Sequence, residues 1–190
     1  MDTLAFVSLM ESGLPITIYP CAAATKGVAE GGLSNAFKGA KDNTYYQLDD
    51  LSFVEKMHPK LRQYVHFVFT RSTDADFLGY LDRVDLPGSV ALPQYQHVWE
   101  TALWMNIAGR RLVQNPQGEV TIKSENEIET TDLVFGEGVL KCDIRVLPSG
   151  IFSYRENIKG LFYIYHRDNP ARYQELMNQA LPAFYTSFLR

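Results

Sequence analysis

The tetrapeptide His166-Arg167-Asp168-Asn169 has the opening residues of a protein-kinase catalytic loop. That loop also needs an asparagine five residues after its aspartate, to hold a magnesium ion. Tyr173 stands at that position, and no further aspartate follows in the chain. Asparagine is a strong helix N-cap, and proline, here Pro170, is favoured at the first helical position. The tetrapeptide therefore predicts a strand-to-helix junction and no kinase activity.

The four histidines are the next candidates for chemistry: His58, His66, His97 and His166. No two of them have the spacing of three or four residues that is typical of metal sites on helices. The cysteines form no Cys-x-x-Cys pair, so a thiolate zinc site is not indicated either. The sequence thus predicts no metal and no cofactor. An alternative stays open, in which some of His58, His66 and His97 meet an acidic residue in the cleft of a small hydrolase or nuclease.

Three glutamates alternate along the chain at Glu125, Glu127 and Glu129. In a strand they would share one face, where paired carboxylates can bind a divalent metal or act as acid and base. Like charges on one side of a strand also keep a sheet edge solvated and unpaired. We favour the solvated edge, because alternating carboxylates alone are a weak sign of a site. The Gly-x-Ser-x-Gly element of serine hydrolases and the phosphate-binding glycine motifs are also missing from the sequence.

Adjacent arginines at Arg110 and Arg111 lie near Trp99 and Trp104 in the chain. Arginine and tryptophan side chains can together contact phosphates and stack on bases, so a nucleic-acid-binding module is a further alternative. The formal net charge is -4, however, and the pI is about 5.6. Nucleic-acid binders usually carry a basic excess. A solvated strand end is the interpretation we favour for the two arginines.

Composition indicates an ordinary soluble globular protein. The chain has 190 residues, 46% of them hydrophobic and 21% charged, which suits one domain over residues 1–190 with a real core. Cys21 and Cys142 make no disulfide framework, and their pairing is left open. The apolar run near the N-terminus follows Asp2 and not a basic region, and no apolar run reaches the roughly 20 residues of a membrane span. We expect a cytoplasmic protein with no membrane contact.

The hydrophobic patterns predict an α+β fold: an antiparallel β-meander of about five or six strands with helices packed on one face. Residues 48–96 have helical spacing, with a second helix that turns Phe77, Leu78 and Leu81 inward. Residues 97–166 alternate like strands, with turn signals at residues 115–118, 136–138 and 148–150. The segment 97–108 fits helix or strand, and we favour strand. Residues 4–20 fit a hairpin equally well as a short first helix.

An Ala/Gly-rich arm at about residues 21–47 separates these parts. Its few large apolar side chains cannot bury enough area to offset the entropy of ordering the segment. It is either a flexible surface loop or an arm that orders against a partner, and both interpretations stay open. In the second case the contacts would come from Val28, Leu33 and Phe37.

Residues 169–190 follow the three- and four-residue spacing of an amphipathic helix throughout. Pro182 falls inside this stretch and should kink or split the helix. The apolar stripe continues to the end of the chain, which is unusual because terminal turns commonly fray. Its last turns should therefore be covered, either by the sheet of the same chain, which we favour, or by a partner. In the second case the contacts would come from Phe184, Tyr185, Phe188 and Leu189.

These observations favour a non-catalytic interaction or assembly protein. It would be a subunit of a larger protein or nucleoprotein complex, through a protein partner or self-association. Nucleic acid would be contacted only as part of such a complex. The indications are the arm, the aromatic-rich terminal helix and the missing catalytic motifs.

Overall fold

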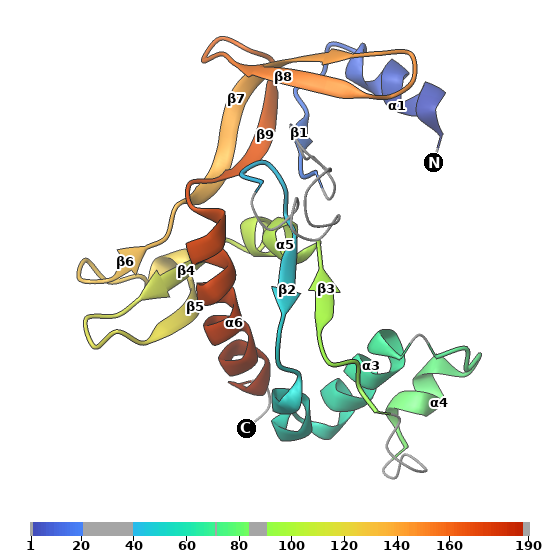
Figure 1. The fold of residues 1–190 in the computed structure, drawn as a ribbon, viewed down its shortest axis with the longest axis vertical. Helices are drawn as coiled ribbons and strands as arrows, with labels where there is room; N and C mark the ends of the chain where they lie inside the picture. Colours follow the sequence, from blue (N-terminus) through green and yellow to red (C-terminus); the bar gives the residue numbers. More distant parts are fainter. Residues whose placement is uncertain (1, 21–39, 71, 84–90, 188–190) are drawn as a thin grey trace. The chain divides into compact units, whose positions relative to one another are not determined.

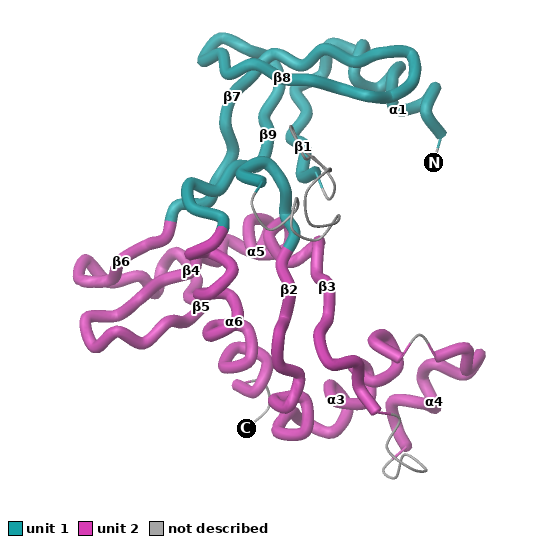
Figure 2. The backbone as a smooth tube through the Cα atoms, viewed as in Figure 1, with its two compact units in different colours: residues 1–45, 136–170 teal, residues 46–135, 171–190 magenta. Residues whose placement is uncertain are grey.

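The computed structural model describes residues 2–20, 40–70, 72–83 and 91–187, and it divides into two compact units (Figures 1 and 2). Unit 1 comprises Met1–Tyr45 and Gly136–Pro170, and unit 2 comprises Tyr46–Phe135 and Ala171–Arg190. Helices and sheets are both present, which confirms the α+β class. The expectation of a single domain over residues 1–190 stays a prediction.

Unit 1 is built on a four-stranded sheet in the order β1-β9-β7-β8. β7 pairs antiparallel with β8 and β9, whereas β1 runs parallel to β9, with Thr17 opposite Tyr163. One helix, α1, precedes the sheet. The elements of the unit are α1 (Thr3–Met10), β1 (Thr17–Ile18), β7 (Glu137–Val146), β8 (Phe152–Glu156) and β9 (Phe162–Arg167).

The helix α1 decides between the two interpretations of the N-terminal segment. Asp2 caps it, because its side-chain Oδ1 accepts a hydrogen bond from the Ala5 amide at 3.0 Å. Phe6 and Met10, four residues apart on one helix face, pack against the sheet. The buried centre of this core is Met10, Cys142, Phe162 and Ile164.

Residues 40–45 also belong to unit 1 and wrap around the end of β9. The Arg167 side chain is 1% exposed and donates to the Ala40 and Tyr45 carbonyls and to the Asn43 side chain. Residues 21–39 of the predicted arm lie outside the described residues. The end of that segment is packed, since the residues from Asp42 to Tyr46 are all buried.

Unit 2 contains two further small sheets, β2-β3 and β5-β4-β6, together with most of the helices. Its elements are β2 (Tyr46–Leu48), η1 (Ser52–Lys56), α3 (Pro59–Phe69), α4 (Phe77–Leu81), β3 (Gln96–Val98), α5 (Thr101–Ile107), β4 (Arg110–Gln114), β5 (Val120–Ser124), η2 (Glu125–Glu127), β6 (Leu133–Val134) and α6 (Pro170–Ser187). Pro170 itself is grouped with unit 1.

The side chains of α6 complete the outer edge of β2. The Gln47 amide donates to Gln174 Oε1 at 2.9 Å, and the Gln47 carbonyl accepts from the amide groups of Gln174 and of Asn178. Because Gln174 and Asn178 are four positions apart, both face the strand from one side of the helix. They satisfy the backbone groups that an edge strand would otherwise expose. Tyr46 also stacks on Tyr173 of the same helix, with ring centroids 5.4 Å apart.

Several local predictions are confirmed. The helix α6 begins at Pro170, directly after the strand-to-helix junction, and the turn at residues 115–118 joins β4 to β5. In that turn Gly118 has φ +87, a left-handed conformation that favours glycine. Asp76 caps α4 by accepting from the Gly79 amide.

Other predictions are wrong for physical reasons that the structure makes visible. The described strands form three small sheets and not one meander. The strand β1 pairs with the distant strand β9, and β2 and β3 form a two-stranded sheet of their own. Residues 101–107 form the helix α5, which the local pattern did not separate from a strand. Leu78, which was expected to face inward, is 72% exposed on α4, a helix of about one and a half turns. The helix α6 continues through Pro182, so the predicted split does not occur, whereas the kink stays a prediction.

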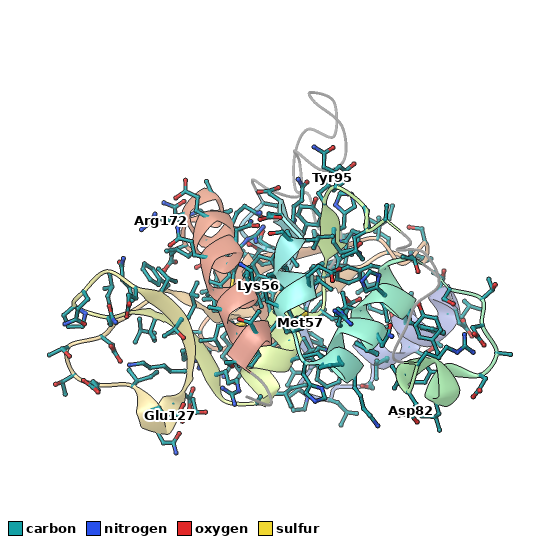
Figure 3. All side chains as sticks on the ribbon, turned by 90° about the horizontal axis from the view of Figure 1, so that it is seen from below. Lys56, Met57, Asp82, Tyr95, Glu127 and Arg172 are labelled. Carbon is teal, nitrogen blue, oxygen red and sulfur yellow. The ribbon has the colours of Figure 1, made fainter. Side chains whose placement is uncertain are left out.

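The alternating glutamates also do not form a strand. Glu125 and Glu127 lie on the 3-10 turn η2, where Figure 3 labels Glu127. Ser124 and Glu127 form a capping box there, so the backbone turns instead of extending. Within the described residues, no helix has the length and apolar character needed to cross a lipid bilayer.

Candidate functional site

An apolar groove of about 300 Å³ lies within unit 2. It is bordered by β2, η1, α3, β3, α5 and the C-terminal part of α6. Most of the side chains that line it are aliphatic or aromatic. The lining residues are Leu48, Phe53, Leu61, Tyr64, Val65, Val68, Phe69, Gln96, His97, Val98, Glu100, Thr101, Trp104 and Tyr185.

The spacing of apolar residues in α3 forms one wall of this groove. Leu61, Tyr64, Val65 and Val68 are separated by three, one and three residues, which places them on one helical face. The first turn of α3 begins at Pro59, with His58 as the N-cap, whose Nδ1 accepts from the Lys60 amide at 3.3 Å. The apolar stripe that the sequence shows is therefore present, but only part of it is covered.

The groove has a buried floor and an exposed rim. Leu48, Phe53 and Val65 are each less than a tenth exposed. On the rim, Trp104 is 63% exposed, Tyr64 46% and Val68 43%. A large apolar side chain on a surface is common in isolation, but a group of them around a concave site is typical of a binding surface.

Tyr185 of α6 also lines the groove. Its ring stacks on Phe53 of the floor, with an interplanar angle of 9° and ring centroids 6.0 Å apart. Burial raises the pKa of the Tyr185 hydroxyl, and the nearby Tyr64 adds to this effect. Among the described lining residues, Glu100 supplies a carboxylate, and neither lysine nor arginine is present.

A second, more polar cavity of about 350 Å³ lies beside η1 and α3, again within unit 2. His66 is 4% exposed, and its Nε2 lies 3.5 Å from Glu55 Oε1. Its Nδ1 has no hydrogen-bond partner among the described residues. The full lining is Asp50, Leu51, Ser52, Glu55, His66, Ala91, Leu92, Pro93 and Gln94.

Asp50 is a fixed negative charge in this acidic pocket. The Ser52 backbone amide donates to Asp50 Oδ1 and the Ser52 hydroxyl to Asp50 Oδ2, both at 2.8 Å. These hydrogen bonds lower the pKa of the Asp50 carboxyl, the backbone amide having the larger effect. The Ser52 hydroxyl is thus engaged with a carboxylate and not with His66.

The kinase-like tetrapeptide has a structural role in unit 1. His166 Nδ1 lies 3.2 Å from Asp42 Oδ1, and its Nε2 lies 3.6 Å from Asp168 Oδ1. Arg167 is buried, as described above. Burial raises the pKa of Tyr154, and a hydrogen bond with Asp42 adds to it. His58, His66 and His97 all lie in unit 2, and His66 is the one whose contact with a carboxylate, that of Glu55, is described above.

The predicted partner-binding residues are placed in part. Phe184 and Tyr185 are both half-buried on α6, and Tyr185 lines the groove. The remaining residues of that prediction fall outside the described part of the chain, and their roles stay predictions: Val28, Leu33, Phe37, Phe188 and Leu189.

The two arginines proposed for nucleic acid have contacts within the protein. The Arg110 guanidinium lies over the Phe184 ring, 5.1 Å from its centroid. Arg111 forms an ion pair of 2.9 Å with Glu125 and a hydrogen bond with Asn106. Binding a phosphate would require Arg111 to give up a carboxylate partner, so this geometry does not favour the nucleic-acid alternative.

The described residues contain no group of three or more His, Cys, Asp or Glu side chains that could hold a metal ion. Cys142 is a free thiol buried in the core of unit 1, where burial raises its pKa. A raised thiol pKa disfavours the reactive thiolate. Cys21 lies outside the described residues.

Sequence reasoning missed Trp104, Tyr64 and Val68 as site residues. Tyr64 and Val68 belong to a stripe that predicts a fully covered helix face. Trp104 was considered only as a neighbour of the arginines. No protein-family model, curated protein or solved structure matches the chain.

Proposed function

We propose that this protein is a non-catalytic interaction protein, a subunit of a larger complex, and that the groove of unit 2 contacts a protein partner or a second copy of the chain. The observation that carries the proposal is the ring of exposed apolar side chains, Trp104, Tyr64 and Val68, around a buried apolar floor. Tryptophan and tyrosine are enriched among the residues that dominate binding energies at protein interfaces.

The energetics of the groove support a macromolecular occupant. Fully burying one exposed large apolar side chain is worth about 1.5–3 kcal/mol. The three rim side chains are already partly buried, so covering each of them would gain roughly half of that value. A partner that inserts one apolar side chain also covers part of the rim. We place the complex in the cytoplasm, with nucleic acid present only if the complex is a nucleoprotein.

Site-specific photo-crosslinking tests the proposal in the native cell. A benzophenone amino acid, which keeps a large aromatic group at the substituted position, replaces Trp104 in one strain and Leu78 in another. Leu78 is a matched control, because it is also helical, in the same unit and 72% exposed. We expect a discrete adduct from position 104 and none from position 78. Equal adducts from both positions, or none from position 104, would contradict the proposal.

A second measurement separates binding from folding. Because Trp104 is mostly exposed, Trp104→Ala should lower the free energy of unfolding by no more than about 0.5 kcal/mol. The variant should nevertheless lose the partner during purification of the complex. If the free energy of unfolding of the variant is much lower than that of the wild type, Trp104 contributes to the fold and not to an interface.

A hydrolase is the second candidate function, favoured by one observation. His66 and Glu55 do meet at a cavity, as that alternative requires, next to Asp50 and Ser52. If the protein is a hydrolase, it should hydrolyse p-nitrophenyl acetate or bis(p-nitrophenyl) phosphate faster than buffer alone. The His66→Gln variant should lose this activity, and the His58→Gln variant should keep it. Absence of turnover, or equal turnover by both variants, rules this candidate out for those ester classes.

A further inference from the structure

The groove and the acidic pocket are lined by neighbouring residues of the same two chain segments of unit 2, one at β2 and the other at β3. Leu48 and Gln96, which are opposite each other in the β2-β3 ladder, line the groove. Asp50 lies two residues after Leu48, and Gln94 two residues before Gln96, and both line the acidic pocket. Two residues of extended chain span at most about 7 Å. A short peptide segment would therefore be long enough to reach both cavities.

The two cavities differ in the chemistry they offer. The groove is apolar, with Glu100 as its charged lining residue. The acidic pocket presents the carboxylates of Asp50 and Glu55, and no lysine or arginine lines it among the described residues. Glu55 already contacts Arg62, 3.5 Å from its Oε2, and His66, 3.5 Å from its Oε1. Lys56 adds to the effect of the Ser52 hydrogen bonds in lowering the pKa of Asp50. The Glu55 side chain is nevertheless 63% exposed, so a partner's cation would approach it from solvent.

One wall of the acidic pocket is apolar, formed by Leu51, Ala91, Leu92 and Pro93. Lysine and arginine side chains have the matching character, because an apolar stem carries a charged head. The stem would lie along this wall while the head reaches the carboxylates. A free ammonium ion would gain only the second of these contacts.

Charge is distributed unevenly between the two units. Unit 2 contains fourteen acidic and ten basic residues, so the whole formal net charge of -4 falls on the unit that contains both cavities. Complementary charge raises association rates and excludes partners of the wrong sign. The electrostatics of unit 2 thus favour a basic partner over an acidic one.

We propose that the partner's contact segment presents a large apolar side chain to the groove and, within a few residues, a lysine or arginine to the acidic pocket. This inference rests on the proposed interaction function and specifies the chemistry of the partner. The order of the two cavities along β2 and β3 sets the spacing of the two side chains.

Three synthetic twelve-residue peptides test the inference on the full chain. One alternates leucine and lysine, the second replaces lysine by glutamate, and the third replaces leucine by alanine. Binding is followed by ¹H–¹⁵N spectra, through the Trp104 indole N–H for the groove and the Ser52 amide for the acidic pocket. We expect both signals to shift saturably with the leucine-lysine peptide, and affinities at least about tenfold weaker for the other two.

Matched variants locate the binding. Trp104→Ala and Glu55→Gln should each weaken the leucine-lysine peptide, whereas Leu78→Ala and Asp82→Asn, at exposed positions of the same unit, should not. Equal binding of the glutamate peptide overturns the inference, as does binding of the lysine peptide that is unaffected by Glu55→Gln.

The native partner gives an independent test. Mass spectrometry of the position-104 adduct identifies the crosslinked segment of the partner. A lysine or arginine within a few residues of the crosslinked apolar residue supports the inference. A crosslinked segment with no nearby basic residue overturns the inference and leaves the interaction function intact, whereas failure of the crosslink contradicts the interaction function itself.

Discussion

Replacing Arg167 by methionine should strongly destabilise unit 1. The guanidinium is 1% exposed, and its three described hydrogen bonds are 3.1 Å to the Ala40 carbonyl, 2.8 Å to the Tyr45 carbonyl and 3.0 Å to Asn43 Oδ1. Methionine fills a similar volume and donates none of them. The substitution therefore isolates the polar contribution of the side chain from its packing.

The magnitude follows from the three hydrogen bonds of the charged guanidinium that would be lost. Asn43 and Tyr45 are almost wholly buried, and a hydrogen bond from a charged donor is worth about 1.5–3 kcal/mol. Relief of the desolvation of the buried charge offsets part of this cost. We expect a loss of about 4 kcal/mol in the free energy of unfolding, which corresponds to a Tm about 8–16 °C lower for a chain of this size.

Urea unfolding followed by circular dichroism measures this loss. Arg155→Met is the control in the same unit, because the Arg155 side chain is 83% exposed and its ion pair with Asp143 is 3.4 Å long. Arg167→Lys should recover only part of the stability, since one ammonium group cannot reach three acceptors that the planar guanidinium spans. If Arg167→Met unfolds within about 1 kcal/mol of Arg155→Met, the hydrogen-bond reasoning fails.

Three other substitutions test the interior of unit 2. Gln174→Ala removes both hydrogen bonds to the Gln47 backbone, so the Gln47 amide should exchange with solvent faster in hydrogen-exchange NMR. Lys123 lowers the pKa of Asp132, so wild-type stability should fall as pH drops below about 4, and Asp132→Asn should flatten this fall in urea titrations. Burial raises the pKa of Tyr185, so stability should fall as pH rises above about 10, and less so in Tyr185→Phe.

Local chemistry made part of the fold predictable. The junction at Asn169-Pro170 and the turn at residues 115–118 depend on residues that act within a few positions of one another. The C-terminal helix was predictable because its apolar period is long and regular. The helix continues through Pro182, and Met177 and Leu181 are buried in the turn that precedes the proline.

Long-range pairing made the rest unpredictable. The strand β1 has two residues and pairs in parallel with β9, about three quarters of the chain away. Nothing in the local pattern of Thr17 and Ile18 specifies that neighbour. Likewise, the Ala/Gly-rich character of residues 21–39 gives no sign that Asn43 and Tyr45, a few positions later, supply buried acceptors to Arg167. That cluster needs contact between segments more than 120 residues apart.

The sequence does not predict the candidate groove, because the direction of the Trp104 side chain depends on whether residues 101–107 form a strand or a helix. In a strand, Trp104 would share a face with Ala102 and Asn106, and it would be one more aromatic of a sheet. In the helix α5, Ala102 and Met105 are buried, three positions apart, while Trp104 is turned outward onto the rim of the groove. Tryptophan is costly to leave in water, so a helix that buries alanine and exposes tryptophan leaves apolar area that a partner could cover. That exposure of Trp104 is the physical reason for proposing that a partner binds in the groove.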